Sequence, residues 1–264
     1  MKTNVFLPSA LAIAVSVALV GCGGGGGNSA ATSPNVTTPP VLNPGDGNGS
    51  NNGDADVNKY NPADYDVVAP DTKGNKVKVG VMDSGVETNA SLKHSVQSVV
   101  RYIEDYENGT ITKEDLFKAG FDVQDIDPNK HGTIVAQIIA AKYADGSGAT
   151  DGLAKEVAQI YGMTTSVEGV GLGTTTANYL AALELNRTHG VKLFNGSFGG
   201  FYDDIPSYKA KLTQYAVKLA NGGSLVVMAT GNNGFDQPTT ESLLPTLDSE
   251  IEKGWLAVTG LDEE

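Results

Sequence analysis

The sequence predicts an α/β fold, a doubly wound sheet of mostly parallel strands that is incomplete at its C-terminal end. Two observations support this prediction. Short apolar runs of strand length recur from residue 77 onwards, and segments with the apolar spacing of helices separate them. Strands separated by helices of ten or more residues pair in parallel, through right-handed crossovers.

The elements alternate along the chain. In residues 77–82, valines alternate with other residues, which predicts the first strand. The segment HGTIVAQIIAAKYA begins at His131 and has helical spacing. Thr174 or Thr175 is expected to cap a second helix, which Gly190 ends. Further strands are predicted at 96–103, 157–163, 191–195, 224–230 and 255–260, and a third helix at 205–223.

The N-terminus has the pattern of an export signal. Lys2 precedes an apolar stretch that Pro8 interrupts and that is short for a membrane-spanning helix, so we interpret residues 1–21 as a signal peptide. The letters LVGC, which end at Cys22, resemble the lipobox of bacterial lipoproteins, where the peptide is cut before a cysteine that then carries a lipid. The alternative is a plain signal peptide with an incidental cysteine. Cys22 is the only cysteine, which excludes an intramolecular disulfide.

Residues 22–59 are rich in Gly, Asn, Ser, Thr and Pro and have little apolar content. Such a segment cannot bury enough surface to fold, so we interpret it as a flexible tether. The folded domain is expected at 60–264. Together these segments predict an exported protein, anchored by a lipid to the bacterial outer membrane or cell surface.

The charge of the chain argues against one class of partner. The formal net charge is −13, and the acidic residues are dispersed. Nucleic-acid binding needs Lys and Arg gathered on one face. We therefore expect no nucleic-acid partner.

Polar side chains follow several predicted strands. Asp83 ends the first strand, and Asn195 and Asn232 follow two later ones. Ligands of open α/β sheets bind at the carboxyl ends of the strands. His131 stands at the start of a helix, where the positive end of the helix dipole favours the neutral imidazole that a general base needs.

Each of these residues also has a structural interpretation. Asp83, followed by Ser84 and Gly85, could serve only to form a turn. His131 could be a helix-capping residue, although His is not a preferred cap. Asn232, in GNNG, could be a turn residue.

Four motifs together resemble the subtilisin-like serine proteases, the subtilases of peptidase family S8. VGVMDSGV, HGTIVAQIIAA, NGSFGG and VVMATGNNG occur in the family's order, and the resemblance covers about residues 76–264. Asp, His and oxyanion Asn follow one another as in subtilisin. The segment LPTLDSEIEKGWLAVTGLDEE is similar to lipid-anchored or autotransporter-type subtilases of Gram-negative bacteria.

The resemblance implies a subtilisin-like sheet, a polypeptide substrate and a role for each residue. Asp83 would orient His131, which would act as general base and then as general acid. Asn232 would donate a side-chain N–H to the oxyanion. Residues 168–173 would form one edge of the cleft. The segment that pairs with the substrate backbone would consist of Ser197, Phe198 and Gly199.

The sequence departs from the family in two places. Ile134 stands where the family has a second histidine after HGT. The family's nucleophile lies in a Gly-Thr-Ser-x-Ala motif downstream of the oxyanion asparagine, whereas Ser242 and Ser249 here lack the small neighbours of that motif. The segment GTTTA at 173–177 lies upstream and has no serine.

Three interpretations follow from the missing nucleophile. The chain is part of a serine endopeptidase whose serine lies further on, a catalytically inactive subtilase-like protein that binds peptides, or a lipid-anchored binding or adhesion module of another kind. Under the first interpretation, a missing C-terminal helix would expose apolar core, so this chain alone is expected to be poorly stable or to aggregate.

No cofactor is expected. Subtilases often bind calcium, but the sequence shows no ligand cluster that would define a site. We interpret Asp122, Asp125 and Asp127 as a solvated acidic loop.

Overall fold

The computed structural model describes residues 76–105, 107–116, 126–145, 147–167, 174–234 and 236–260. The expected signal peptide, the lipidation residue Cys22 and the tether lie outside these residues. So do Asp122, Asp125 and the expected cleft edge at 168–173.

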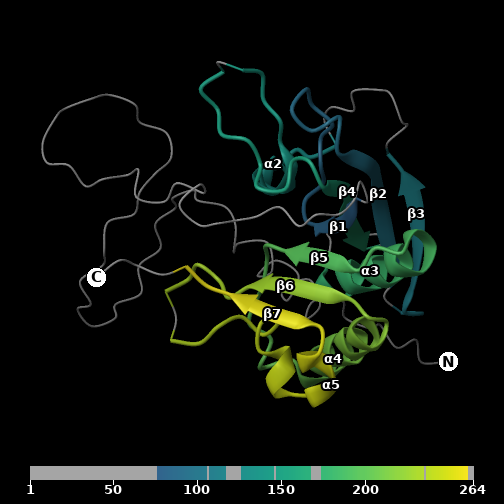
Figure 1. Cartoon of the computed structure of the whole chain (residues 1–264). Coiled ribbons are helices and arrows are strands. Elements are labelled where there is room, and N and C mark those ends of the chain that lie inside the picture. Colours follow the sequence, from purple (N-terminus) through teal and green to yellow (C-terminus); the bar gives the residue numbers. More distant parts are fainter. Residues whose placement is uncertain are drawn as a thin grey trace, which may run out of the picture. The chain divides into compact units, whose positions relative to one another are not determined.

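A seven-stranded sheet forms the centre of the described structure, in the order β3-β2-β4-β1-β5-β6-β7 (Figure 1). All neighbouring strands are parallel except β2 and β3, which form an antiparallel pair. This arrangement confirms the predicted α/β fold. The strands are β1 Val77–Met82, β2 Val96–Asp105, β3 Thr110–Asp115, β4 Ala158–Val167, β5 Leu193–Gly196, β6 Leu225–Ala229 and β7 Trp255–Val258.

Three longer helices connect the strands: α2 His131–Ala140, α3 Thr175–His189 and α4 Pro206–Asn221. The caps of α3 were predicted correctly, because Thr174 accepts a hydrogen bond from the backbone N–H of Ala177, and Gly190 ends the helix with φ of 65°. A 3-10 turn, η3 Leu244–Thr246, and a short helix, α5 Ser249–Glu252, precede β7 and were not predicted.

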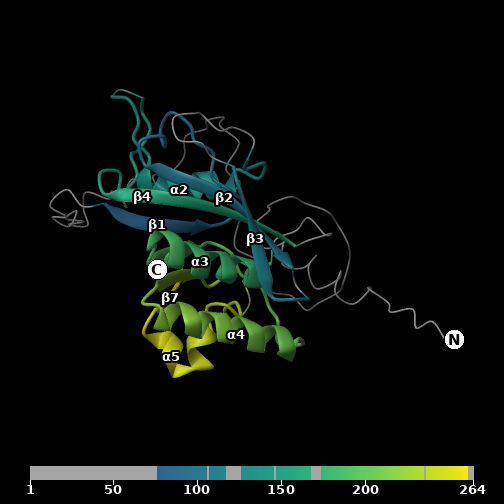
Figure 2. The same ribbon diagram turned by 90° about the vertical axis from the view of Figure 1, so that its right-hand side faces the viewer.

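The two faces of the sheet carry separate apolar cores. Helices α3 and α4 pack together on one face, over a core that includes Phe194, Val226 and Met228 (Figure 2). On the other face, α2 contacts β1 and β4, and its small residues join a core around Val81 and Ile160. The site described below lies at the end of the sheet where α2 begins.

Helix α2 buries its small residues and exposes two of its isoleucines. Ile134 and Ile138 are 53% and 60% exposed, whereas the buried positions include Gly132 and Ala136. The cause is a close approach of α2 to the turn after β1. A Cβ on Gly132 would stand 2.8 Å from the Cβ of Asp83. Only small side chains fit between the helix and the turn.

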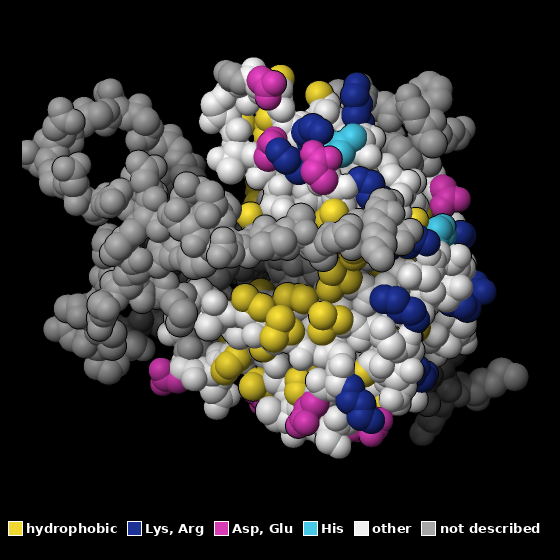
Figure 3. Space-filling model, in the orientation of Figure 1, with side chains coloured by type: hydrophobic (Ala, Val, Ile, Leu, Met, Phe, Trp, Pro, Cys, Tyr) yellow, Lys and Arg dark blue, Asp and Glu magenta, His cyan; other side chains and the backbone are white. Residues whose placement is uncertain are grey.

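Part of the sheet is apolar and exposed. Alternate residues of β6 and β7 point to the α2 side, and among them Leu225, Leu256 and Val258 are 42%, 51% and 47% exposed. Because Val227 pairs with Leu256, these residues form one surface, which we call the β6–β7 face (Figure 3). Within the described residues, α2 packs on β1 and β4 and leaves this face open.

Candidate active site

The register of the sheet brings the predicted site residues to one edge. Met82 of β1 pairs with Gly196 of β5, which in turn pairs with Met228 of β6. Asp83 and Ser197 are therefore the next residues on neighbouring strands. The loop that carries Asn232 leaves the following strand at the same edge.

Asp83 and His131 form the predicted pair. Nδ1 of the imidazole lies 2.8 Å and 3.0 Å from the two carboxylate oxygens of Asp83. The Asp83 side chain is 4% exposed and that of His131 is 30% exposed. Because a carboxylate can only accept a hydrogen bond, Nδ1 must carry the proton and donate it. This leaves Nε2 with a lone pair. Within the described part of the chain, the side-chain hydrogen bonds of His131 both involve Nδ1.

The surroundings of Asp83 act on its charge in opposite directions. Burial raises the pKa of the carboxyl group above its ordinary value, and hydrogen bonds from His131 and from the backbone N–H of Ser84 partly offset that rise. The bond from Ser84 is 2.7 Å long. Since burial disfavours the carboxylate, its charge depends on these donors.

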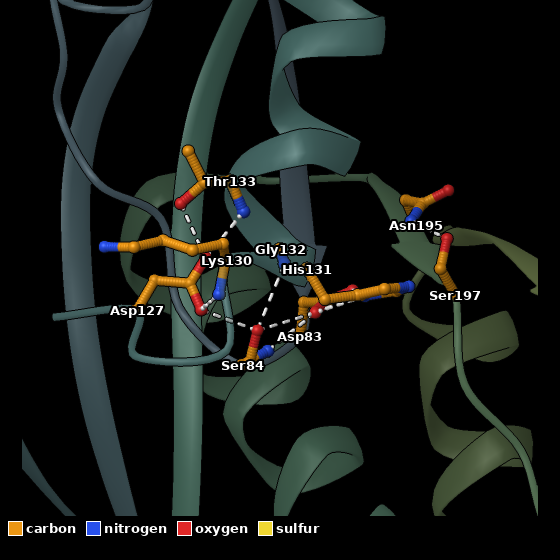
Figure 4. Close-up of polar contacts among 9 residues, drawn as sticks. All are labelled: Asp83, Ser84, Asp127, Lys130, His131, Gly132, Thr133, Asn195 and Ser197. Carbon is orange, nitrogen blue, oxygen red and sulfur yellow. Dashed lines mark hydrogen bonds and ion pairs between the residues drawn. The ribbon is translucent and has the colours of Figure 1, made fainter. Parts of the chain in front are cut away.

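Asp127 organises the start of α2, and its interpretation as a solvated loop residue was wrong. It is fully buried. Its carboxylate accepts the N–H of Thr133 at 2.8 Å, the hydroxyl of Thr133 at 2.6 Å and the N–H of Lys130 at 3.0 Å. Ser84 donates to it at 2.7 Å and accepts the N–H of Gly132 at 3.1 Å (Figure 4). Asp127 thus binds the helix end on both sides of His131.

A signal for Asp127 is present in the sequence. It stands four residues before the first residue of α2, in the region where helix N-termini select side-chain acceptors for their unpaired N–H groups. Lys130, the capping position, makes no side-chain cap of its own and adopts left-handed dihedrals, with φ of 64°. Ser84 was regarded only as part of a turn, and its bridging hydroxyl was also missed.

The expected substrate segment continues from β5. Asn195 donates to the hydroxyl of Ser197 at 2.9 Å, and Phe198 is partly buried against the core. Gly199 lies close to Thr239, whose side chain is 2.7 Å from the position that a Cβ would take. In Figure 4, the ring of His131 points toward the side on which Asn195 and Ser197 lie.

Asn232 lies in the loop after β6 and is exposed. Gly231 before it has φ of 109°, a conformation that favours glycine. The structure therefore places an amide side chain beyond the carboxyl end of β6, next to the strand that leads to Ser197.

No described serine is bonded to His131 as a nucleophile would be. Ser84 lies on the Asp83 side of the ring and bonds to Asp127. Ser242 is buried and donates to the backbone oxygen of Thr239 at 2.8 Å. Ser249 is the first residue of α5. The described residues thus hold an imidazole against a carboxylate and place no serine hydroxyl at its Nε2.

The described residues contain no group of three or more His, Cys, Asp or Glu side chains arranged to hold a metal ion. None of their helices is long and apolar enough to cross a membrane.

Residues 74–264 match a family model described as "Subtilase family". No curated protein sequence matches the chain.

Solved structures with similar folds include the Clostridium perfringens CspB protease, at 19% identity and a TM-score of 0.42 over 66% of this chain and 39% of that one. The patellamide maturation protease PatG has 15% identity and a TM-score of 0.40, with 72% and 58% covered. Pseudomonas sedolisin, a serine-carboxyl proteinase solved with pseudo-iodotyrostatin, has 13% identity and a TM-score of 0.36, with 66% and 45% covered. The chain therefore spans less than two thirds of the length of each of these proteins.

Proposed function

Because the chain belongs to the subtilase family of serine peptidases, we propose that it supplies the acid–base pair and the oxyanion donor of an endopeptidase. The nucleophilic serine would come from polypeptide beyond residue 264. The observation that carries this proposal is the Asp83–His131 pair, with Nδ1 held at 2.8 Å and the ring partly exposed.

The chemistry follows from the free lone pair on Nε2. A serine hydroxyl placed there gives its proton to Nε2 while its oxygen attacks the carbonyl carbon of the substrate. Asn232 donates to the oxyanion, and Asp83 stabilises the imidazolium. The imidazolium then protonates the leaving amine, and water repeats the sequence to release the acyl group.

The β6–β7 face supports a further segment beside this pair. Leu225, Leu256 and Val258 are exposed on the α2 side of the sheet, the side from which His131 approaches. A helix that covered this face would bury apolar surface now in water. A serine at its first turn would then lie at the same edge of the sheet as His131.

The substrate would be a polypeptide in extended conformation. The segment Ser197–Gly199 follows Gly196, the last residue of β5 and the last that pairs with β6. A peptide backbone could therefore pair with this segment as an added strand.

A catalytically inactive peptide-binding protein is the second candidate. The observation that favours it is that the described residues place no serine hydroxyl at Nε2 of His131. Both candidates use the same cleft and differ only in the nucleophile.

Sequencing the DNA past codon 264 distinguishes these two candidate functions. We expect the reading frame to continue into a Gly-Thr-Ser-x-Ala motif. The translated protein should then be labelled by a fluorophosphonate probe, and H131A should not be labelled, because the serine would lack its base. A stop codon directly after Glu264 would leave peptide binding as the function.

We also propose that the protein is exported and held at the bacterial outer membrane or cell surface by a lipid on Cys22. The proposal rests on the LVGC motif, on an unpaired cysteine after an apolar leader, and on the tether-like composition that follows. Cells fed radiolabelled palmitate should label the wild-type protein and not C22A. Equal labelling of both would exclude this anchor.

A further inference from the structure

Glu241 is a buried carboxyl group outside the Asp83–His131 pair. It is fully buried in the segment between β6 and η3. One oxygen, Oε2, accepts the backbone N–H of Gly200 at 2.9 Å, and Oε1 accepts the hydroxyl of Thr175 at 2.9 Å. Its own carbonyl accepts the indole N–H of Trp255 at 3.0 Å. Glu241 therefore connects the substrate segment, α3 and β7.

The segment around Glu241 also bonds to two parts of the proposed site. Thr240 donates its N–H to the carbonyl of Gly200 at 2.8 Å, so both backbone groups of Gly200 bond to residues 240 and 241. Thr239 donates its N–H to the carbonyl of Thr230 at 2.9 Å, at the start of the Asn232 loop. The position of Ser197–Gly199 relative to that loop thus depends on residues 239–241.

Neither donor that bonds to the Glu241 carboxylate, the Gly200 N–H or the Thr175 hydroxyl, carries a positive charge. Burial raises the pKa of Glu241 to about 7, and the bonds from Gly200 and Thr175 offset part of that rise. The titratable groups that face it are three phenols: Tyr179 on α3, Tyr202 before α4, and Tyr208 on α4. Burial first, and then the charge of Glu241, raises the pKa of Tyr179 and of Tyr202.

We propose that Glu241 is a positioning residue of the peptide-binding strand, whose ionised carboxylate fixes Gly200 and so sets the geometry of Ser197–Gly199 for substrate. This inference rests on the proposed peptide binding. The Gly200 N–H can only donate, so Oε2 must accept, and the negative charge of the ionised carboxyl group strengthens that bond. Protonation removes this charge: a proton on Oε1 leaves Gly200 a weaker, neutral bond and reverses the bond with the Thr175 hydroxyl, and a proton on Oε2 disrupts the Gly200 bond.

The test measures the state of the Gly200 backbone and the affinity for a peptide ligand separately. Every sample carries H131A, which removes the imidazole of the proposed active site from the measurement. The Gly200 amide is followed by NMR from pH 5 to 9, and affinity for fluorescein-labelled unfolded casein is measured over the same range. The variant is E241Q. The matched control is E104Q, since Glu104 is also fully buried but bonds to Thr174, Thr176 and Lys211.

We expect the Gly200 amide to titrate near pH 7 with Glu241 present, and casein affinity to rise roughly tenfold through that range, the worth of one charge-assisted hydrogen bond. E241Q should abolish both changes and E104Q should keep them. A Gly200 amide that does not titrate, or that titrates equally in E241Q, would overturn the inference. If Gly200 titrates as expected but casein binds at no pH, Glu241 still positions the strand and the proposed peptide binding is what fails.

Discussion

At the residue scale, the geometry of the Asp83–His131 pair depends on Asp127 as well as on the two residues themselves. His131 is the first residue of α2. The N–H groups on either side of it, from Lys130 and Thr133, both bond to the buried carboxylate of Asp127. Asp83 fixes the imidazole through Nδ1, whereas Asp127 fixes the backbone from which the imidazole projects.

Replacing Asp127 by Asn should therefore cost more than an ordinary capping change. The amide keeps one acceptor oxygen but presents N–H groups where donors already point, so we expect the free energy of unfolding to fall by about 2–4 kcal/mol. D248N removes a similar carboxylate at the partly buried N-cap of α5, and should cost about 1 kcal/mol. Urea unfolding compares the two variants, and equal losses would show that Asp127 is only a cap.

Glu241 should make stability depend on pH. Its pKa is about 7 in the folded chain against an ordinary value of 4.5, so between these values the folded state binds more protons than the unfolded state. Stability from this group is present below pH 4.5 and is lost as pH rises through 7.

The loss is on the order of 3 kcal/mol. E241Q, which cannot ionise, should gain stability relative to the wild-type chain from pH 5 to pH 8. Denaturant unfolding at several pH values measures the difference in free energy of unfolding between E241Q and the wild-type chain. A difference that does not change with pH would contradict a raised pKa of Glu241.

Short sequence motifs were enough to predict the Asp83–His131 pair, whereas the residues that support it became apparent only in the structure. Asp83 and His131 stand in recognisable patterns and lie in contact. Asp127 and Glu241 act through bonds to segments as many as 66 residues away, as between Glu241 and Thr175. No local pattern reports such a bond, because it depends on how the sheet brings distant loops together.

At the scale of elements, periodicity predicted the parallel strands well. The predicted first strand, 77–82, matches β1, and the cap and end of α3 were identified. The strand β3, TITKED, was missed because it is mostly polar and exposed. Its pairing with β2 stabilises it through backbone hydrogen bonds that leave no apolar signal. The spacing predicted α2 but not which side of it is buried, which close packing at Gly132 decides.

The β6–β7 face gives a prediction at this scale. Leu256 is 51% exposed, so L256Q should leave the thermal midpoint of the 264-residue chain nearly unchanged. In the protein translated from the complete frame, a covering helix would bury Leu256, and L256Q should cost about 1–3 kcal/mol. L247Q is the control, since Leu247 is 45% exposed away from this face. Equal small effects of both variants in the longer protein would mean that nothing covers the face.

At the scale of the whole molecule, the proposed function would account for both the open β6–β7 face and the missing nucleophile. A further helix over β6 and β7, with a serine at its start, would complete both. The 264-residue chain should then show a broad thermal transition and bind a hydrophobic dye, because its apolar face meets water. A sharp, cooperative transition in a monomeric sample without dye binding would contradict this expectation.

The central claim is that Asp83 and His131 act together as the base of a serine peptidase. The most direct measurement is the kcat for peptide hydrolysis by the protein translated from the complete frame, compared with D83A and H131A and the double variant. The effects of replacing residues that act as a unit do not add. We therefore expect each single variant to lose kcat by roughly 10⁴-fold or more, and the double variant to lose little further. Hydrolysis that survives H131A, or single losses that multiply in the double variant, would show that this pair is not the catalytic base.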